Sequence, residues 1–342
     1  MCYSFPTMSL GKTHIALLAA FAALVLAACG GADDTKDNAS SSDGGGGGTS
    51  LSLVAYSTPQ VVYDEIIPEF KKTAEGKNVD FKTSFGASGD QSRAVEGGLK
   101  ADYVSFSTEG DMTRLVEAGL VGDDWQSTPS KGLVTTSVVA FVVRKGNPKN
   151  IKTWDDLVKP GVEVLTPNPF SSGAAKWNLL AALGANDLDY VSKLINDHVK
   201  VQDKSGREAL QNFLSGSGDV LLSYEYEAIT AQKKGEEVDY VIPDDTIKID
   251  INAGVTKDAP AEAKAFYDYV LSEAGQEKFA SWGYRPVNET VLAANKEQFP
   301  TPSGLFTIDK FGGWEKTDAE LFDPENGKIA KIEEDAGVST AK

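Results

Sequence analysis

The stretch VDFKTSFGASGDQ, residues 79–91, sets out the fold class of this chain. Its first seven residues form a β-rich run. Ser88 and Gln91 then have the spacing of a capping box, in which a serine and the residue three positions later satisfy each other's backbone donors at a helix start. A strand that turns directly into a helix is the repeating unit of α/β proteins. The stretch therefore predicts an α/β layer here.

The same alternation continues outward from this stretch. Short β-rich runs are separated by helix-period segments, and the runs are residues 51–56, 79–85, 101–107, 137–143, 163–166, 219–224, 238–242 and 247–255. Val62, Ile66 and Phe70 recur every four residues, which places them on one helix face. A similar helical pattern covers residues 261–282 through Phe266, Val270, Ala274 and Phe279. The chain as a whole is predicted to be α/β.

Two interleaved domains are expected. No tandem repeat is visible, and no second low-complexity linker follows residue 50. We predict one lobe from residues 51–140 with 251–300, a second from residues 141–250, and a C-terminal segment, 301–342, packed across both. Two lobes joined by long strands leave a cleft between them, where hinge closure can enclose a small ligand.

The N-terminus predicts export. An apolar run at residues 15–28 follows Lys12 and has the length of a signal-peptide core, too short for a comfortable membrane span. It ends in Leu26-Ala27-Ala28-Cys29, which resembles a bacterial lipobox, so residues 1–28 are expected to be removed and Cys29 lipidated. Translation from either Met1 or Met8 fits. Residues 29–50 then form a small, polar tether on an extracytoplasmic, membrane-anchored protein.

The charge balance excludes one class of partner. The 33 Lys and Arg against 50 Asp and Glu give a net charge of −17. Nucleic acids are held mainly by Lys and Arg, so no nucleic-acid partner is expected. A small anion is still compatible, because local dipoles in a closed cleft can hold it whatever the net charge.

Catalytic signals are weak. Of the two histidines, His14 lies in the signal and His198, expected at the surface, has no metal-type or nucleophile partner nearby in sequence. Neither a Gly-x-Ser-x-Gly elbow nor a His-Glu-x-x-His motif occurs. We predict a protein that is not an enzyme and needs no cofactor or metal, with a lipid-anchored hydrolase as the less favoured alternative.

Four predicted strand-to-helix turns carry the binding hypothesis. Each combines a hydroxyl side chain with small neighbours, and the four turns are Ser57-Thr58-Pro59, Ser88-Gly89, Ser171-Ser172-Gly173-Ala174 and Ser205-Gly206-Arg207. Taken singly, each is a helix cap. Several helix starts at the carboxyl ends of strands can direct backbone N–H groups at one anion. A site of donors alone suits a fully ionised sulfate and leaves the proton of phosphate without an acceptor.

These residues also lie in a broad family resemblance. From residue 51 to 314 the chain resembles the periplasmic sulfate- and thiosulfate-binding proteins, which have the type II solute-binding fold. The matching segments are GASGDQSRAV (86–95), VVRKGNPK (142–149), WDDLVKPG (154–161), TPNP (166–169), WN (177–178), GDVL (218–221), RPV (285–287) and FGGW (311–314). The resemblance implies a monomer that delivers its anion to an ABC-importer permease with an ATPase.

The resemblance also implies which residues bind. The family's two serine–glycine turns fall on Ser88 and on Ser172, Gly173 and Ala174. Ser57 and Gly206 take the positions of backbone donors, and Arg207 stands behind them as a supporting charge. Tyr224 replaces a tryptophan that the family commonly uses, and molybdate-binding proteins of the same broad fold use a tyrosine. The ligand is therefore expected to be sulfate, with thiosulfate and molybdate left open.

Overall fold

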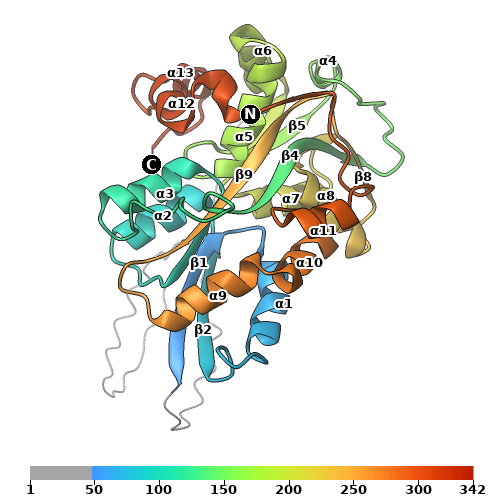
Figure 1. The fold of residues 1–342 in the computed structure, drawn as a ribbon. Coiled ribbons are helices and arrows are strands. Elements are labelled where there is room, and N and C mark those ends of the chain that lie inside the picture. Colours follow the sequence, from blue (N-terminus) through green and yellow to red (C-terminus); the bar gives the residue numbers. More distant parts are fainter. Residues whose placement is uncertain (1–47, 342) are drawn as a thin grey trace, which may run out of the picture. The chain divides into compact units, whose positions relative to one another are not determined.

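The strands of residues 48–341, the part of the chain that the computed structural model describes, form one mixed sheet of eleven strands (Figure 1). The order is β2-β1-β3-β9-β4-β7-β5-β6; β8 and β10 pair with β4, and β11 pairs with β9. The strands are β1 Thr49–Tyr56, β2 Val79–Gly86, β3 Tyr103–Phe106, β4 Leu133–Arg144, β5 Val164–Pro167, β6 Val199–Asp203, β7 Val220–Tyr224, β8 Val238–Val241, β9 Asp245–Val255, β10 Arg285–Pro286 and β11 Gly304–Phe306.

Two long strands join the two halves of this sheet. In the first half, β1 runs parallel to both β2 and β3, and β3 pairs with the end of β9. In the second half, β5 runs parallel to β6 and β7. β4 pairs with β9 through its first residues and with β7 and β8 through its last. The chain is thus an α/β protein whose sheet has two regions, each with three parallel strands.

Helices cover both regions. They are α1 Gln60–Phe70, α2 Ser88–Glu96, α3 Glu109–Glu117, α4 Trp154–Leu157, α5 Gly173–Ala185, α6 Leu188–Lys193, α7 Gly206–Leu214, α8 Glu225–Lys233, α9 Ala261–Leu271, α10 Glu273–Ser281, α11 Glu289–Ala294, α12 Trp314–Leu321 and α13 Lys328–Asp335, with a π-helical turn at Leu194–His198 and a 3₁₀ turn at Ile308–Phe311. In Figure 1, α9 and α1 lie beside the first half and α5, α6 and α7 beside the second.

The predicted strands and the first helix are confirmed. All eight β-rich runs are strands, and Val62, Ile66 and Phe70 are buried on one face of α1. Strand β1 begins at Thr49, two residues before the start that we expected. β6, β10 and β11 were not predicted.

The long helix predicted for residues 261–282 is wrong. Ser272 has extended backbone angles, ends α9 and caps α10 by accepting a hydrogen bond from the N–H of Gly275. Because the break rotates the following residues, Ala274 is exposed although the single-helix pattern placed it on the buried face.

The C-terminal segment touches both halves of the sheet. Asp318 of α12 pairs with Lys176 of α5 at 2.5 Å, and α12 also packs on α3. On α13, Glu333 accepts a hydrogen bond from Gln202 of β6. All described residues fall in one compact unit, so the boundaries near residues 140, 250 and 300 remain a prediction about how the chain moves.

The predictions for the N-terminus concern residues that the structure does not describe. The signal at residues 1–28, Cys29 and the tether up to residue 47 lie outside the described residues. Within residues 48–341, no helix combines the length and apolar character needed to cross a membrane, and no cluster of acidic, histidine or cysteine side chains could hold a metal ion.

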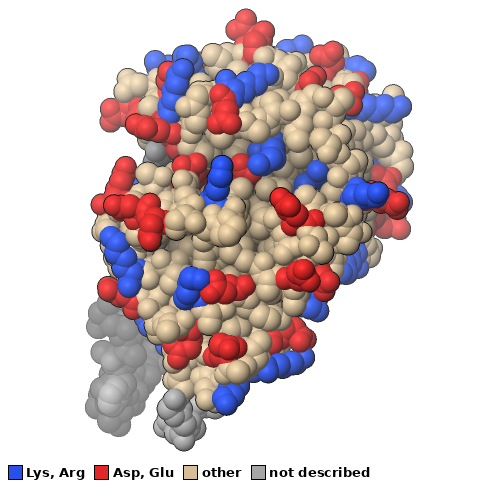
Figure 2. Space-filling model, in the orientation of Figure 1, with Lys and Arg blue, Asp and Glu red and all other residues tan. Residues whose placement is uncertain are grey.

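Figure 2 shows acidic and basic side chains interspersed over the face in view.

Candidate anion-binding site

A small cavity lies where the carboxyl ends of six strands meet. Segments after β1, β2 and β3 reach it from the first half of the sheet, and segments after β5, β6 and β7 from the second. The lining residues are Tyr56, Ser57, Thr58, Ser88, Ser107, Ser172, Gly173, Ala174, Gly206 and Tyr224. The volume within which the centre of a water-sized sphere can move in this cavity is about 10 Å³. Parallel strands direct the following helix starts to this edge, which is the usual binding edge of open α/β sheets.

All seven residues predicted to bind ligand line this one cavity. They are Ser57, Ser88, Ser172, Gly173, Ala174, Gly206 and Tyr224. Arg207 does not line it. Its guanidinium donates to the carbonyl of Ser57 and to Oε1 of Gln60, so it holds the turn after β1 from behind. The structure therefore brings together residues that are far apart in sequence, with neutral donors at the surface of the cavity.

Two helix starts from the second half face the cavity with backbone donors. Gly173 and Ala174 are the first residues of α5, and Ser172 is its N-cap but makes no side-chain capping bond. Gly206 is the first residue of α7, where Ser205 and Glu208 form the capping box that the sequence predicted. The first N–H groups of a helix have no partner inside the helix. They are thus available to an anion, which the helix dipole also favours.

Gly173 permits a close approach between the two halves. A Cβ at this position would lie 1.9 Å from Oγ of Ser107 and 2.9 Å from Cγ2 of Thr108. A Cβ at Gly206 would meet its nearest neighbours only at ordinary contact distances of 3.4 Å and more. The absence of a side chain is therefore required at the start of α5 and is not required at the start of α7.

The predicted role of Ser88 as a helix cap is wrong. Ala87 is the N-cap of α2, and Ser88 is already the first helical residue. The Ser88 hydroxyl instead donates to Oδ2 of Asp111 at 2.7 Å and accepts from the backbone N–H of Ser107 at 3.0 Å. Thr108 donates to the same carboxylate oxygen at 2.9 Å. Ser88 must turn its proton away from Asp111 before it can donate to an anion.

Two hydroxyls that line the cavity have no hydrogen-bond partner among the described residues. Oγ of Ser107 and the phenol oxygen of Tyr224 are both enclosed, in side chains that are 1% and 0% exposed. Burial raises the pKa of Tyr224 well above its usual value, so it stays protonated. The nearby Ser107 hydroxyl opposes that pKa shift in part, although the two oxygens form no hydrogen bond of ordinary geometry. A buried, unpaired hydroxyl costs about 1–3 kcal/mol, so both positions favour a bound partner.

A stack of tyrosines supports Tyr224. Its ring stacks on Tyr226 at 4.9 Å, and Tyr226 stacks on Tyr284 at 3.7 Å. The Tyr226 hydroxyl lies 2.8 Å from Oγ1 of Thr58, so it links α8 to the turn after β1. Rings packed in this way have few alternative rotamers, and the phenol of Tyr224 is therefore held in place.

One buried carboxyl lies behind the cavity. Glu227 on α8 is 5% exposed and accepts a hydrogen bond from Ser223 at 2.5 Å. Its Oε2 is 3.4 Å from the position that a Cβ at Gly206 would take. Burial raises the pKa of Glu227 to about 7, against smaller opposing effects of Ser223, Arg207 and Lys234. Below that pH the carboxyl is neutral and adds no negative charge beside the cavity.

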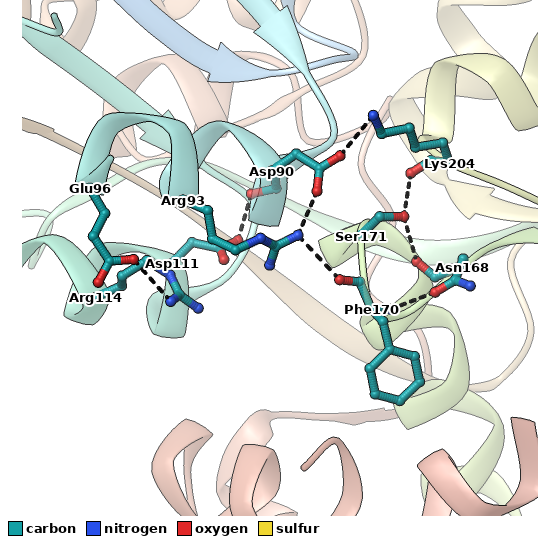
Figure 3. Close-up of polar contacts among 10 residues, drawn as sticks. Asp90, Arg93, Glu96, Asp111, Arg114, Asn168, Phe170, Ser171 and Lys204 are labelled. Carbon is teal, nitrogen blue, oxygen red and sulfur yellow. Dashed lines mark hydrogen bonds and ion pairs between the residues drawn. The ribbon is translucent and has the colours of Figure 1, made fainter. Parts of the chain in front are cut away.

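Polar contacts also join the two halves beside the cavity (Figure 3). The backbone N–H of Gly89 donates to the Ser171 carbonyl at 3.1 Å. Arg93 donates to the Phe170 carbonyl at 3.4 Å, and Lys204 lies 3.1 Å from Oδ2 of Asp90. These contacts hold α2 against the segments that precede α5 and α7.

Sequence reasoning missed several residues of the site. Ser107 and Asp111 had a local signal, since a Ser-Thr pair followed by acidic residues at the end of a predicted strand is typical of a helix start. Glu227 had none, because only the tertiary structure brings it beside Gly206, which lies 21 residues earlier in the chain. The prediction that His198, which lies outside the site, is at the surface is wrong. The residue is 7% exposed, and its Nδ1 lies 3.1 Å from the Val162 carbonyl.

Comparisons with known proteins show the family to which this chain is related. The family model "Bacterial extracellular solute-binding protein" matches residues 51–285. A sulfate-binding protein of Synechococcus elongatus is 38% identical, covering 80% of this chain and 83% of the relative. A thiosulfate-binding protein of Pseudomonas aeruginosa is 33% identical, covering 76% and 85%. The solved sulfate-binding protein SubI from Mycobacterium tuberculosis H37Rv is 46% identical with a TM-score of 0.78, covering 80% of this chain and all of that one.

The resemblance noted in the sequence is therefore confirmed, as is the α/β architecture expected from it. The chain belongs to the sulfate- and thiosulfate-binding family of bacterial extracellular solute-binding proteins, which have the type II solute-binding fold, act outside the cytoplasm in ABC import and are not enzymes.

Proposed function

We propose that this protein captures sulfate in the cavity between Ser107, Gly173, Gly206 and Tyr224 and delivers it to an ABC importer. The observation that carries the proposal is the pair of enclosed, unpaired hydroxyls of Ser107 and Tyr224, which face the same cavity as the starts of α5 and α7. Hydroxyl and backbone donors that converge on one point complement an anion. An anion with several oxygens would give each of these donors an acceptor.

The lining favours a fully ionised anion. None of the ten residues that line the cavity is acidic or basic. Sulfate has only acceptor atoms, whereas phosphate near neutral pH keeps a proton that needs an acceptor. Asp111 does not line the cavity, and its Oδ2 already accepts hydrogen bonds from Ser88 and Thr108. Leaving the phosphate proton unpaired would cost about 1–3 kcal/mol, so discrimination against phosphate is about 5- to 150-fold or more.

The size of the cavity also suits a tetrahedral oxyanion. The volume in which the centre of a water-sized sphere can move is only about 10 Å³, so the cavity suits a small inorganic ion and not an organic molecule. A larger central atom needs the donors to move apart, which a packed tyrosine stack resists.

Capture is proposed to involve closure of the two lobes defined above, 51–140 with 251–300 and 141–250. Gly89, Arg93 and Arg207 contact the opposite half of the sheet. A closed pair of lobes is the form that we expect the permease to recognise, with a monomer of this chain per transporter.

Membrane attachment is proposed through Cys29. The support is the sequence Leu26-Ala27-Ala28-Cys29 after an apolar run, followed by a small, polar tether. Cys29→Ser should release the protein from the membrane fraction and remove the lipid mass from its N-terminal peptide. A Cys29→Ser protein that stays in the membrane fraction contradicts the anchor.

Thiosulfate and molybdate are the alternatives within this function. Thiosulfate is supported by the relative from Pseudomonas aeruginosa at 33% identity, and molybdate by the phenol of Tyr224 in place of an indole donor. A lipid-anchored hydrolase lacks support, because the cavity lining offers no carboxylate, histidine or cysteine for proton transfer.

Isothermal titration of the purified protein tests the proposal. Sulfate, thiosulfate, molybdate and phosphate are titrated separately at neutral pH. Sulfate is expected to bind tightest and phosphate weakest. Ser172→Ala should weaken sulfate binding more than Ser57→Ala, because the first removes a hydroxyl ligand and the second leaves the backbone donor. No heat with any of the four anions would overturn the proposal, and tighter molybdate binding would reassign the ligand.

A further inference from the structure

A second cavity lies away from the candidate anion site and shares no lining residue with it. It is bordered by the middle of β4, by β9, by β10 and α11, and by the segment from Phe299 to β11. The volume within which the centre of a water-sized sphere can move is about 350 Å³ here, against about 10 Å³ in the first cavity. That volume is in the range of about 300–1,000 Å³ found for small-molecule sites.

A buried cation is fixed at this cavity. Arg285 is 8% exposed and lines it. Its Nε and Nη2 donate to the two carboxylate oxygens of Glu225 at 2.6 and 3.0 Å, and Nη2 also donates to the Pro300 carbonyl at 2.8 Å. Nη1 takes no part in these bonds. Because the other two nitrogens fix the plane of the guanidinium, Nη1 is a pre-positioned donor for a ligand acceptor.

One further cation of the lining, Lys296, is unpaired. Lys296 is exposed and forms no ion pair within residues 48–341, and Lys248 lies 2.9 Å from Asp250. Arg285 and Lys248 are each paired with a carboxylate outside the lining, Glu225 and Asp250, and Glu289 is the acidic residue of the lining itself. Lys296 and the free Nη1 of Arg285 are therefore the donors that this lining offers to an anionic group.

An apolar surface adjoins these cations. Leu292 on α11 lines the cavity and is 38% exposed, and it is one of two large apolar side chains that are exposed within the described residues. Phe299 lies beneath, with the Arg285 guanidinium 5.7 Å from its ring centre. Apolar side chains beside a few fixed polar groups are the usual composition of a site for a small organic molecule.

We propose that this second cavity binds a small organic carboxylate with an apolar body. The carboxylate accepts from Nη1 of Arg285 and from Lys296, and the apolar body covers Leu292 and Phe299. An inorganic anion would leave the apolar surface in water, and an apolar amine would place its charge beside Lys296 and the Nη1 donor of Arg285. The site does not depend on what the first cavity binds.

Phenylacetate is the probe for this proposal, with phenylacetamide and phenethylamine as its neutral and cationic counterparts. Binding is measured by titration calorimetry on the whole protein, with and without sulfate. Phenylacetate is expected to bind one equivalent, at least tenfold tighter than either counterpart, and to remain bound when sulfate is added. No binding of phenylacetate, equal binding of the three compounds, or displacement by sulfate would each overturn the proposal.

Paired variants locate the binding. Lys296→Glu and Leu292→Asp change exposed side chains and are expected to weaken phenylacetate at least tenfold. Lys82→Glu on β2 and Leu99→Asp, the other exposed large apolar residue, make the same changes away from the cavity and should leave binding within about twofold. Sulfate titrations of all four variants should match the parent protein. Equal effects of the near and distant variants would place phenylacetate elsewhere and overturn the assignment.

Discussion

Replacement of Gly173 by alanine tests the geometry of the anion site most directly. The new Cβ would lie 1.9 Å from Oγ of Ser107, and ordinary contact begins near 3.4 Å, so one of the two must move by about 1.5 Å. Overpacking of this kind costs about 1–3 kcal/mol. Because Gly173 and Ser107 come from different halves of the sheet, the clash is relieved when the halves separate. We expect Gly173→Ala to disfavour the closed form and to weaken sulfate binding about 5- to 150-fold.

Gly206→Ala is the matched control. Gly206 is also the first residue of a helix that faces the same cavity, but a Cβ there meets its neighbours at 3.4 Å and more. Titration with sulfate should show a much smaller loss for Gly206→Ala, and thermal unfolding without sulfate should be nearly unchanged in both variants. If Gly173→Ala bound sulfate within threefold of the parent protein, the close approach of Ser107 to α5 would not matter for binding.

Three further predictions follow from the same site. Tyr224→Phe should lose at least tenfold in sulfate affinity by calorimetry while its unfolding midpoint stays the same or rises, since the phenol is unpaired; unchanged affinity would remove Tyr224 from the site. Because the pKa of Glu227 is raised to about 7, its carboxyl gains a charge beside Gly206 between pH 6 and 8, so sulfate affinity should fall over that range and Glu227→Gln should abolish the fall; a parallel fall in the variant would point to another group. Lys204→Ala should weaken sulfate no more than about fivefold, because its pair with Asp90 is 68% and 30% exposed; a larger loss in titration would make this pair a determinant of closure.

The raised pKa of Glu227 also has a consequence for stability. The native state holds this proton more tightly than the unfolded chain, whose carboxyl has the ordinary value of 4.5. The resulting contribution to stability is complete below pH 4.5 and is lost as the pH rises through about 7. Burial also raises the pKa of Glu333 on α13 to about 7. The free energy of unfolding of Glu227→Gln, measured in urea, should therefore keep part of this pH dependence.

Much of the fold could be predicted because its strands are apolar and sharply bounded. β6 was missed because Val199–Asp203 is only partly buried and its apolar alternation consists of just Val199 and Val201, a short pattern between polar residues. The break at Ser272 was missed because serine is common both inside helices and at their starts. Tertiary packing decided between the two.

The candidate site was predictable to the extent that its residues are local. The turns after β1, β2 and β5 each combine a predicted strand end with a helix start, and the turn after β6 shows the capping-box spacing of Ser205 and Glu208, so these patterns are visible in the sequence. The partner of Ser88 was not, because Asp111 lies 23 residues further along and reaches it only after β3 is placed. Ser107 likewise depends on Trp177, whose Nε1 donates to the Ser107 carbonyl at 2.6 Å.

The path of β9 bears on the order in which the chain acquires its structure. During synthesis, and again as an exported chain leaves a membrane pore, β4 to β8 emerge before β9. The second half of the sheet therefore has its internal pairings available early. β3 must wait for the last residues of β9, since Tyr103 to Phe106 pair with Asn252 to Val255. Until then β3 presents an open edge, the kind of surface on which unfinished chains aggregate. Shielding of this edge is thus most needed while the middle of the protein is emerging, after its first strands have formed.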